Sequence, residues 1–154
     1  MFAFFKKFLR LKDQQKKIAF IDGDQDLHKV LETYQKYVAN TNTETHLVRL
    51  KRESHNEPKI LRKTKNINKI YLDGYTSKKE VVDKFIGAYI QKAVSDGYKE
   101  ISVISSDYDF IDIFKMAVRI DPNATNILFK MIVPHAEGRL CDLPEKILNI
   151  EIIK

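Results

Sequence analysis

Short apolar segments alternate along this chain with segments whose apolar residues recur at helical spacing, and this alternation restricts the fold more than any other feature of the sequence. Short apolar runs are typical of strands buried on both faces, which form parallel sheets covered by helices. We therefore predict an α/β domain with a mainly parallel sheet sandwiched by helices. The predicted strands are residues 18–22, 45–50, 67–75, 100–105, 126–133 and, as a last short one, 149–154.

Three segments carry the apolar stripe of an amphipathic helix. One follows the first predicted strand and another follows the fourth. The clearest lies between the third and fourth strands, where Ser77 and Glu80 form a capping box and Gly97 ends the helix. The stretch 51–66 has no such stripe, and we expect an irregular loop there.

The chain has 154 residues, a length that suits one domain with its own core. We assign residues 17–154 to this domain and residues 1–16 to a basic N-terminal segment, in which Phe and Leu are mixed with Lys and Arg. We expect this segment to form a short amphipathic helix. It would pack on the domain, bind a partner protein or a second copy of the chain, or rest on an anionic membrane.

The sequence contains no apolar run of the length that crosses a membrane, so we expect no transmembrane segment. The single cysteine, Cys141, cannot form an internal disulfide, which fits a reducing compartment. We therefore expect a cytoplasmic protein.

The net charge of +6 is concentrated in one segment. Between residues 49 and 69 there are eight Lys or Arg residues and two Glu residues, so this segment alone carries +6. Such a run is either a solvated surface or a surface that binds phosphates. In the second interpretation the partner is RNA, single-stranded or structured, and the expected contacts are Arg49, Lys51, Arg52, Arg62, Lys63 and Lys65.

Two predicted strands end in carboxylates: "IAFIDGDQD" leads into Asp22, and "VISSDYDF" leads into Asp107 and Asp109. The carboxyl ends of parallel strands meet at one edge of a sheet, where ligands bind. Asp83 borders the apolar stripe of the clearest predicted helix, so we expect it to lean toward the same edge.

Each of these acids also has a structural explanation. Asp109 fits a capping box with Ser106 as the N-cap, and Asp24 could cap the first helix. Taken together, however, several carboxylates in one place repel one another unless a cation lies among them. Carboxylate oxygens suit hard ions, so the expected cofactor is Mg²⁺ or Mn²⁺.

Three motifs, in this order, resemble those of the NYN/PIN-like nuclease superfamily: "IAFIDGDQ", "KKEVVDKFIGAYI" and "ISSDYDF". The resemblance covers roughly residues 17–135. It implies a PIN-like, Rossmann-like parallel α/β/α sandwich that holds one or two divalent metal ions on acidic residues and cleaves RNA.

The resemblance assigns roles to individual residues. Asp22, Asp83 and Asp107 would bind the metal, Asp109 would be the second acid of the third motif, and Lys79 would be the basic residue before the helix acid. Two positions depart from the family pattern. Many members have Asn where this chain has Gln25, and many have a second helix acid where it has Tyr89. These departures favour a single tightly bound metal ion.

The resulting hypothesis is a Mg²⁺- or Mn²⁺-dependent endoribonuclease in which water, activated by the metal, attacks a phosphodiester in line. One alternative is a catalytically degenerate RNA-binding or assembly module, which Gln25 and Tyr89 favour. Another is a phosphatase of the haloacid-dehalogenase type, with Asp22 as nucleophile and Asp24 as acid/base.

Overall fold

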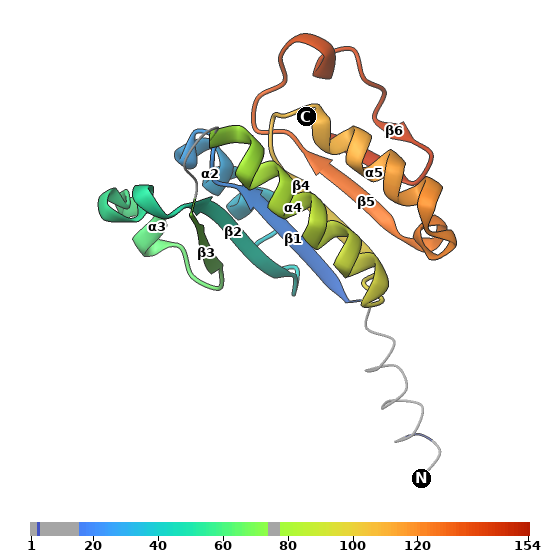
Figure 1. The fold of residues 1–154 in the computed structure, drawn as a ribbon, viewed down its shortest axis with the longest axis horizontal. Coiled ribbons are helices and arrows are strands. Elements are labelled where there is room, and N and C mark those ends of the chain that lie inside the picture. The colour runs from blue at the N-terminus through green and yellow to red at the C-terminus, as the bar shows by residue number, and fades with distance from the viewer. Residues whose placement is uncertain (1–2, 4–15, 74–77) are drawn as a thin grey trace.

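The computed structural model describes residue 3, residues 16–73 and residues 78–154 (Figure 1). The predicted N-terminal helix of residues 1–16 lies, apart from residues 3 and 16, outside the described residues. So does Ser77, the first residue of the predicted capping box.

One seven-stranded sheet forms the centre of the domain, with strand order β3-β2-β1-β4-β5-β7-β6. Every neighbouring pair is parallel except β6 and β7, which are antiparallel. The prediction of a mainly parallel sheet is therefore confirmed. The strands are β1 (Lys17–Asp22), β2 (Glu44–Leu50), β3 (Asn68–Leu72), β4 (Glu100–Ile104), β5 (Leu128–Ile132), β6 (Lys146–Ile147) and β7 (Ile150–Ile153).

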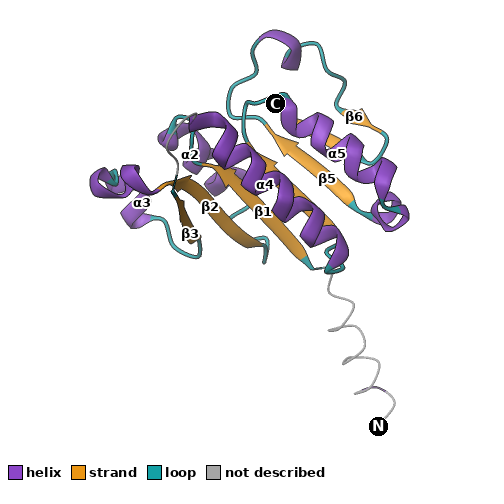
Figure 2. Cartoon of the chain, viewed as in Figure 1, coloured by secondary structure: helices purple, strands orange, loops and turns teal. Residues whose placement is uncertain are grey.

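Helices cover both faces of this sheet, as predicted (Figures 1 and 2). One face is covered by α4 (Lys78–Ser95) and α5 (Asp109–Ile120), and the other by α2 (Leu27–Tyr37) and the short α3 (Lys59–Lys63). Three 3₁₀ turns complete the described structure: η1 (Lys51–Asn56), η2 (Pro122–Asn126) and η3 (Gly138–Leu140). None of the described helices is long and apolar enough to span a bilayer.

The alternation of side chains along β1 shows how the core is divided. Ile18 and Phe20 pack in the cluster on the α4 and α5 side, whereas Ala19 and Ile21 pack on the α2 side. Because side chains of a strand alternate between its two faces, Asp22 falls on the side of α4 and α5. The strand period thus decides which helices this carboxylate faces.

The stretch 51–66 is not the irregular loop that the sequence predicted. It contains η1 and α3, and α3 is held by Leu61, which is fully buried against the α2 side of the core. The predicted cap of the first helix was also wrong. Asp26, not Asp24, caps α2, because Asp26 Oδ1 accepts hydrogen bonds from the backbone N–H groups of His28 (3.1 Å) and Lys29 (3.3 Å).

The strand order creates a switch point between β1 and β4. The chain builds β2 and β3 on one side of β1, crosses back through α4, and then adds β4 on the other side. The loops that follow β1 and β4 therefore leave the sheet in opposite directions, and ligands in such sheets bind in the crevice between them. Asp22 and Asp107 lie at this position.

Candidate metal centre

Asp22 ends β1 and is buried, with 1% of its surface exposed. Its Oδ2 accepts a hydrogen bond of 2.7 Å from the hydroxyl of Ser105, and its Oδ1 accepts one of 3.2 Å from the backbone N–H of Asp24. The parallel register pairs Ile21 with Ile104, so Asp22 and Ser105 are level at the ends of their strands. Both carboxylate oxygens of Asp22 are therefore held by the ends of β1 and β4.

Ser105 connects Asp22 to the loop that carries Asp107. Its hydroxyl donates to Asp22 and accepts a hydrogen bond of 3.0 Å from the backbone N–H of Asp107. The side chain of Asp107 in turn accepts a hydrogen bond of 3.0 Å from the backbone N–H of Asp109. The predicted Ser106 cap is thus wrong, because the side chain of Asp107 accepts the hydrogen bond from the first backbone N–H group of α5. Three consecutive hydrogen bonds therefore hold this loop.

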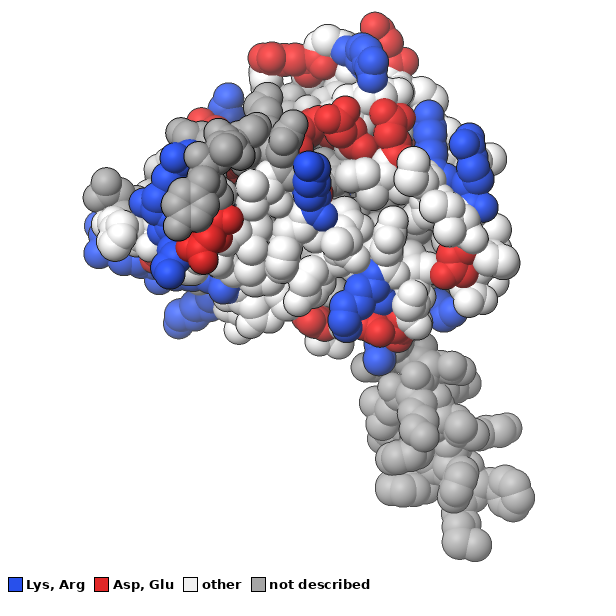
Figure 3. Space-filling view, in the orientation of Figure 1, with Lys and Arg blue, Asp and Glu red and all other residues white. Residues whose placement is uncertain are grey.

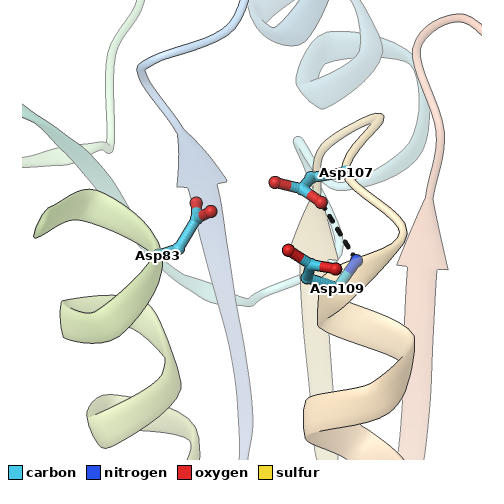
Figure 4. Close-up of side chains that lie close together, drawn as sticks. All are labelled: Asp83, Asp107 and Asp109. Atoms are coloured by element: carbon cyan, nitrogen blue, oxygen red, sulfur yellow. Dashed lines mark hydrogen bonds between the residues drawn. The ribbon is translucent and has the colours of Figure 1, made fainter. Parts of the chain in front are cut away.

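Asp83, Asp107 and Asp109 converge on one point (Figure 4). One carboxylate oxygen from each lies within 4.8 Å of the other two. Asp83 reaches this point from α4, Asp107 from the loop after β4, and Asp109 from the first residue of α5. We refer to these three residues as the Asp cluster. The structure therefore brings together three of the four acids that the sequence singled out, with Asp22 beside them at the end of β1.

Two of these acids have raised pKa values. Burial raises the pKa of Asp22 to about 6, against the opposing hydrogen bonds from Ser105 and the Asp24 amide. Burial, followed by the nearby charge of Asp22 and the carboxyl group of Asp107, raises the pKa of Asp83 to about 8. Both shifts have the sign expected for acids that lack a compensating cation. Within the described residues, none of the three members of the Asp cluster forms an ion pair with Lys or Arg.

These properties fit a hard divalent cation. Mg²⁺ and Mn²⁺ prefer carboxylate oxygens, and opposite ligands of Mg²⁺ lie about 4.2 Å apart because each bond is about 2.1 Å long. A spread of 4.8 Å among the three oxygens requires only small rotations to match this. A cation at this point would also remove the repulsion that raises the pKa of Asp83.

The basic segment lies beyond the carboxyl end of β2, at the same edge of the sheet. Most of its predicted RNA contacts are exposed on η1, on α3 or just after it: Lys51, Arg52, Arg62, Lys63 and Lys65. Figure 3 shows acidic atoms gathered near the upper ends of α4 and α5 and basic atoms at the left, where α3 lies. The side chain of Lys79 lies outside the described part of the chain.

Arg49 was predicted to contact RNA on the surface, and the structure contradicts this. Its side chain is buried, 6% exposed as a residue, and its Nη2 donates to Glu53 at 3.3 Å. Arg49 packs over Gly23, where an added Cβ would lie 2.2 Å from Arg49 Cγ and 2.4 Å from the carbonyl oxygen of Val48. The reason is the strand period: Arg49 shares the α2 side of β2 with Leu47, so it points into the layer beneath α2 and α3.

The two departures from the family pattern have defined structural positions. Gln25 uses its side-chain Oε1 to accept a hydrogen bond of 3.1 Å from the backbone N–H of Ser106, which links the β1–α2 loop to the β4–α5 loop. Tyr89 packs its ring against Phe20, Phe85 and His46. Tyr89 therefore contributes to the layer between α4 and the sheet, two turns away from Asp83.

Two functional contacts were missed by the sequence analysis. Ser105 was read only as part of the strand end, although a hydroxyl between two predicted metal-binding acids is the signal that could have identified it. Gln25 was treated as a deviation, although its amide is the group that joins the two loops of the site. Both bind backbone N–H groups of the β4–α5 loop, which carries Asp107.

Comparisons with known proteins do not assign a family. No family model and no curated protein matches the chain. Among solved structures, the chain is similar to a wide-type short-chain dehydrogenase/reductase from Veillonella parvula DSM 2008 in complex with NADP, at a TM-score of 0.37 and 15% sequence identity. The match covers 77% of this chain and 48% of that one, so this chain spans about half the length of that protein. A similarity this low carries no argument about fold or activity.

Proposed function

We propose that this protein is a metal-dependent endoribonuclease of the PIN-like type, which cleaves RNA at the Asp cluster. The observation that carries this proposal is the convergence of three carboxylates, from α4, the β4–α5 loop and α5, at the switch point of a parallel sheet. Helix capping alone does not account for it, because Asp83 lies in a different element from the two acids at the start of α5.

Asp83, Asp107 and Asp109 would hold Mg²⁺ or Mn²⁺. When bound, the ion would supply Lewis-acid chemistry: it lowers the pKa of water and offsets negative charge on the phosphate. Asp109 is the exposed member of the cluster and would orient the attacking water. Asp22 holds the Ser105 hydroxyl, and Ser105 holds the amide of Asp107, so Asp22 acts as a positioning residue beneath the cluster.

The exposed cations of η1 and α3 support RNA as the substrate. They present positive charge on the surface, which suits contacts to a phosphate backbone that do not depend on base sequence. Their place at the carboxyl edge of the sheet puts them on the same edge as the Asp cluster. We expect RNA binding to weaken steeply as salt concentration rises.

The test is cleavage of single-stranded RNA in the presence of Mn²⁺, Mg²⁺ or a chelator. We expect cleavage only with a divalent ion, and we expect Asp107→Asn to abolish it. Asp112→Asn is the matched control, because Asp112 also lies in the first turn of α5 but is exposed and outside the Asp cluster. Equal loss of activity in both variants would contradict the proposal.

The two alternatives make different predictions in the same assay. An RNA-binding or assembly module would bind RNA but never cleave it with any divalent ion. A phosphatase of the haloacid-dehalogenase type would form an acyl-phosphate on Asp22. The geometry does not favour that reaction, because a nucleophile must reach its substrate, whereas Asp22 is 1% exposed and both of its oxygens accept hydrogen bonds.

A further inference from the structure

A pocket lies at the same edge of the sheet as the Asp cluster. It has a volume of about 240 Å³ and is lined by the first residues of α2, by Ser106, and by the loop after β5 that holds Pro134 and His135. Because α2 lies on the opposite face of the sheet from α4 and α5, this pocket and the Asp cluster occupy the two sides of one switch point. Nothing in the proposed reaction at the Asp cluster uses it.

One short loop separates the pocket from the cluster. Ser106 lines the pocket, and the next residue, Asp107, belongs to the Asp cluster. The loop is held from both sides: the backbone N–H of Ser106 donates to Gln25, and the hydroxyl of Ser106 accepts a hydrogen bond of 3.3 Å from the backbone N–H of His135. An RNA strand with a phosphate at the Asp cluster would therefore pass over Ser106 and reach the pocket.

The unpartnered polar groups of the pocket are mainly donors. Lys29 forms no ion pair within the described chain, and the side-chain NH₂ of Gln25 has no hydrogen-bond partner there. The two acids of the pocket keep their charge, although Asp26 caps α2 through one oxygen and Glu137 pairs with His135 at 2.8 Å. Lys29 and the amide of Gln25 are therefore the groups that would contact a phosphate or another acceptor of a ligand.

The remaining walls suit a base. Val30 and Pro134 are apolar, and the imidazole of His135 offers a flat ring on which an unstacked base can lie. The combination of one cation, one amide donor and apolar walls matches a nucleotide: a phosphate for the cation, a polar base edge for the amide, and a base face for the walls.

We propose that this pocket seats the nucleotide adjacent to the scissile phosphate, with its own phosphate on the Lys29 ammonium and its base against Pro134 and His135. This inference rests on the proposed function, because it treats the pocket as a subsite of the RNA that is cleaved at the Asp cluster. It makes RNA binding depend on residues outside the basic segment of η1 and α3.

The first experiment measures binding of a short fluorescently labelled single-stranded RNA in chelator, where no cleavage occurs. We expect Lys29→Gln to weaken binding and to reduce the slope of log Kd against log salt concentration by about 0.7, the value for one phosphate contact to a single strand. Lys36→Gln is the matched control, because Lys36 is exposed on the last turn of the same helix, outside the pocket. We expect His135→Ala to raise Kd about five-fold or more, the loss expected for one stacked base.

The second experiment measures RNA cleavage with Mn²⁺ for the same variants. We expect Lys29→Gln and His135→Ala to raise KM while kcat stays close to that of the natural chain, since neither residue touches the Asp cluster. The two experiments separate the two proposals. If cleavage is metal-dependent but both pocket variants bind RNA with unchanged affinity and salt slope, the pocket inference is overturned and the nuclease stands. If no cleavage occurs but Lys29→Gln alone weakens binding, the nuclease is overturned, and the pocket is a nucleotide site without a cleavage role.

Discussion

Replacing Asp22 by Asn should stabilise the metal-free protein at neutral pH, although Asp22 is one of the most buried polar residues of the site. Burial raises its pKa from 3.8 to about 6. Between these two values the folded protein binds a proton that the unfolded chain has lost, so the free energy of unfolding falls as pH rises from about 4 to about 6 and stays lower above that. At 1.36 kcal/mol per pKa unit, the fall amounts to about 3 kcal/mol.

Asn has no proton to lose, so the Asp22→Asn variant should not show this fall. It keeps one acceptor for Ser105 or for the Asp24 amide, so one of these donors loses its partner and the new NH₂ group lacks an acceptor, which together cost about 2 kcal/mol. At about pH 7.5 the variant should therefore be more stable than the natural chain by about 1 kcal/mol. Near pH 4, where Asp22 is protonated, its advantage should disappear.

The assay is urea unfolding of the natural chain and the Asp22→Asn variant in chelator at both pH values. Chelator is required, because a cation at the Asp cluster would favour the ionised carboxylates. If Asp22→Asn destabilises the protein equally at both pH values, burial does not raise the pKa of Asp22, and the electrostatic account of the site is wrong.

Three further outcomes follow from the geometry. Mn²⁺ at about 100 times its Kd should stabilise the natural chain by about 2.7 kcal/mol, seen as a higher Tm, and should not stabilise Asp107→Asn. Ser105→Ala should lower the free energy of unfolding by about 1–3 kcal/mol, because Asp22 and the amide of Asp107 both lose a buried partner. The measurement is urea unfolding, and Ser95→Ala, on the exposed end of α4, is the control. Gly23→Ala should destabilise the protein by more than 1 kcal/mol in the same assay, since the new methyl group would collide with the backbone at Val48 as well as with Arg49. A neutral effect would contradict the close approach of Gly23 to β2.

The sheet and its carboxylate edge could be predicted because both follow from periodicity. Buried strands show as apolar runs, and the end of a run marks the edge where Asp22 and Asp107 meet. Asp83 could be placed because the helical period of α4 fixes its direction relative to the apolar stripe. These three positions depend on local geometry, which the sequence carries directly.

The features that were mispredicted depend on contacts between distant segments. Helix α3 has five residues and one fully buried anchor, Leu61, too few to produce a recognisable stripe. Arg49 is followed in sequence by exposed cations. The strand period puts it on the α2 side of β2, but its burial there also depends on the register that places Val48 beside Asp22 and brings Gly23 under the arginine. The link between Gln25 and Ser106 likewise spans two loops that no local pattern connects.

The hydrogen bond between Ser105 and Asp22 joins residues separated by 83 positions in the chain. Contacts of such long sequence separation form only when most of the chain has already been ordered, because closing so large a loop is entropically costly. A nascent or partly unfolded chain therefore possesses all of its aspartates without the arrangement that could bind a cation. Any activity that depends on this arrangement appears only after β4 has docked beside β1, so under the proposed function incompletely folded molecules should not cleave RNA.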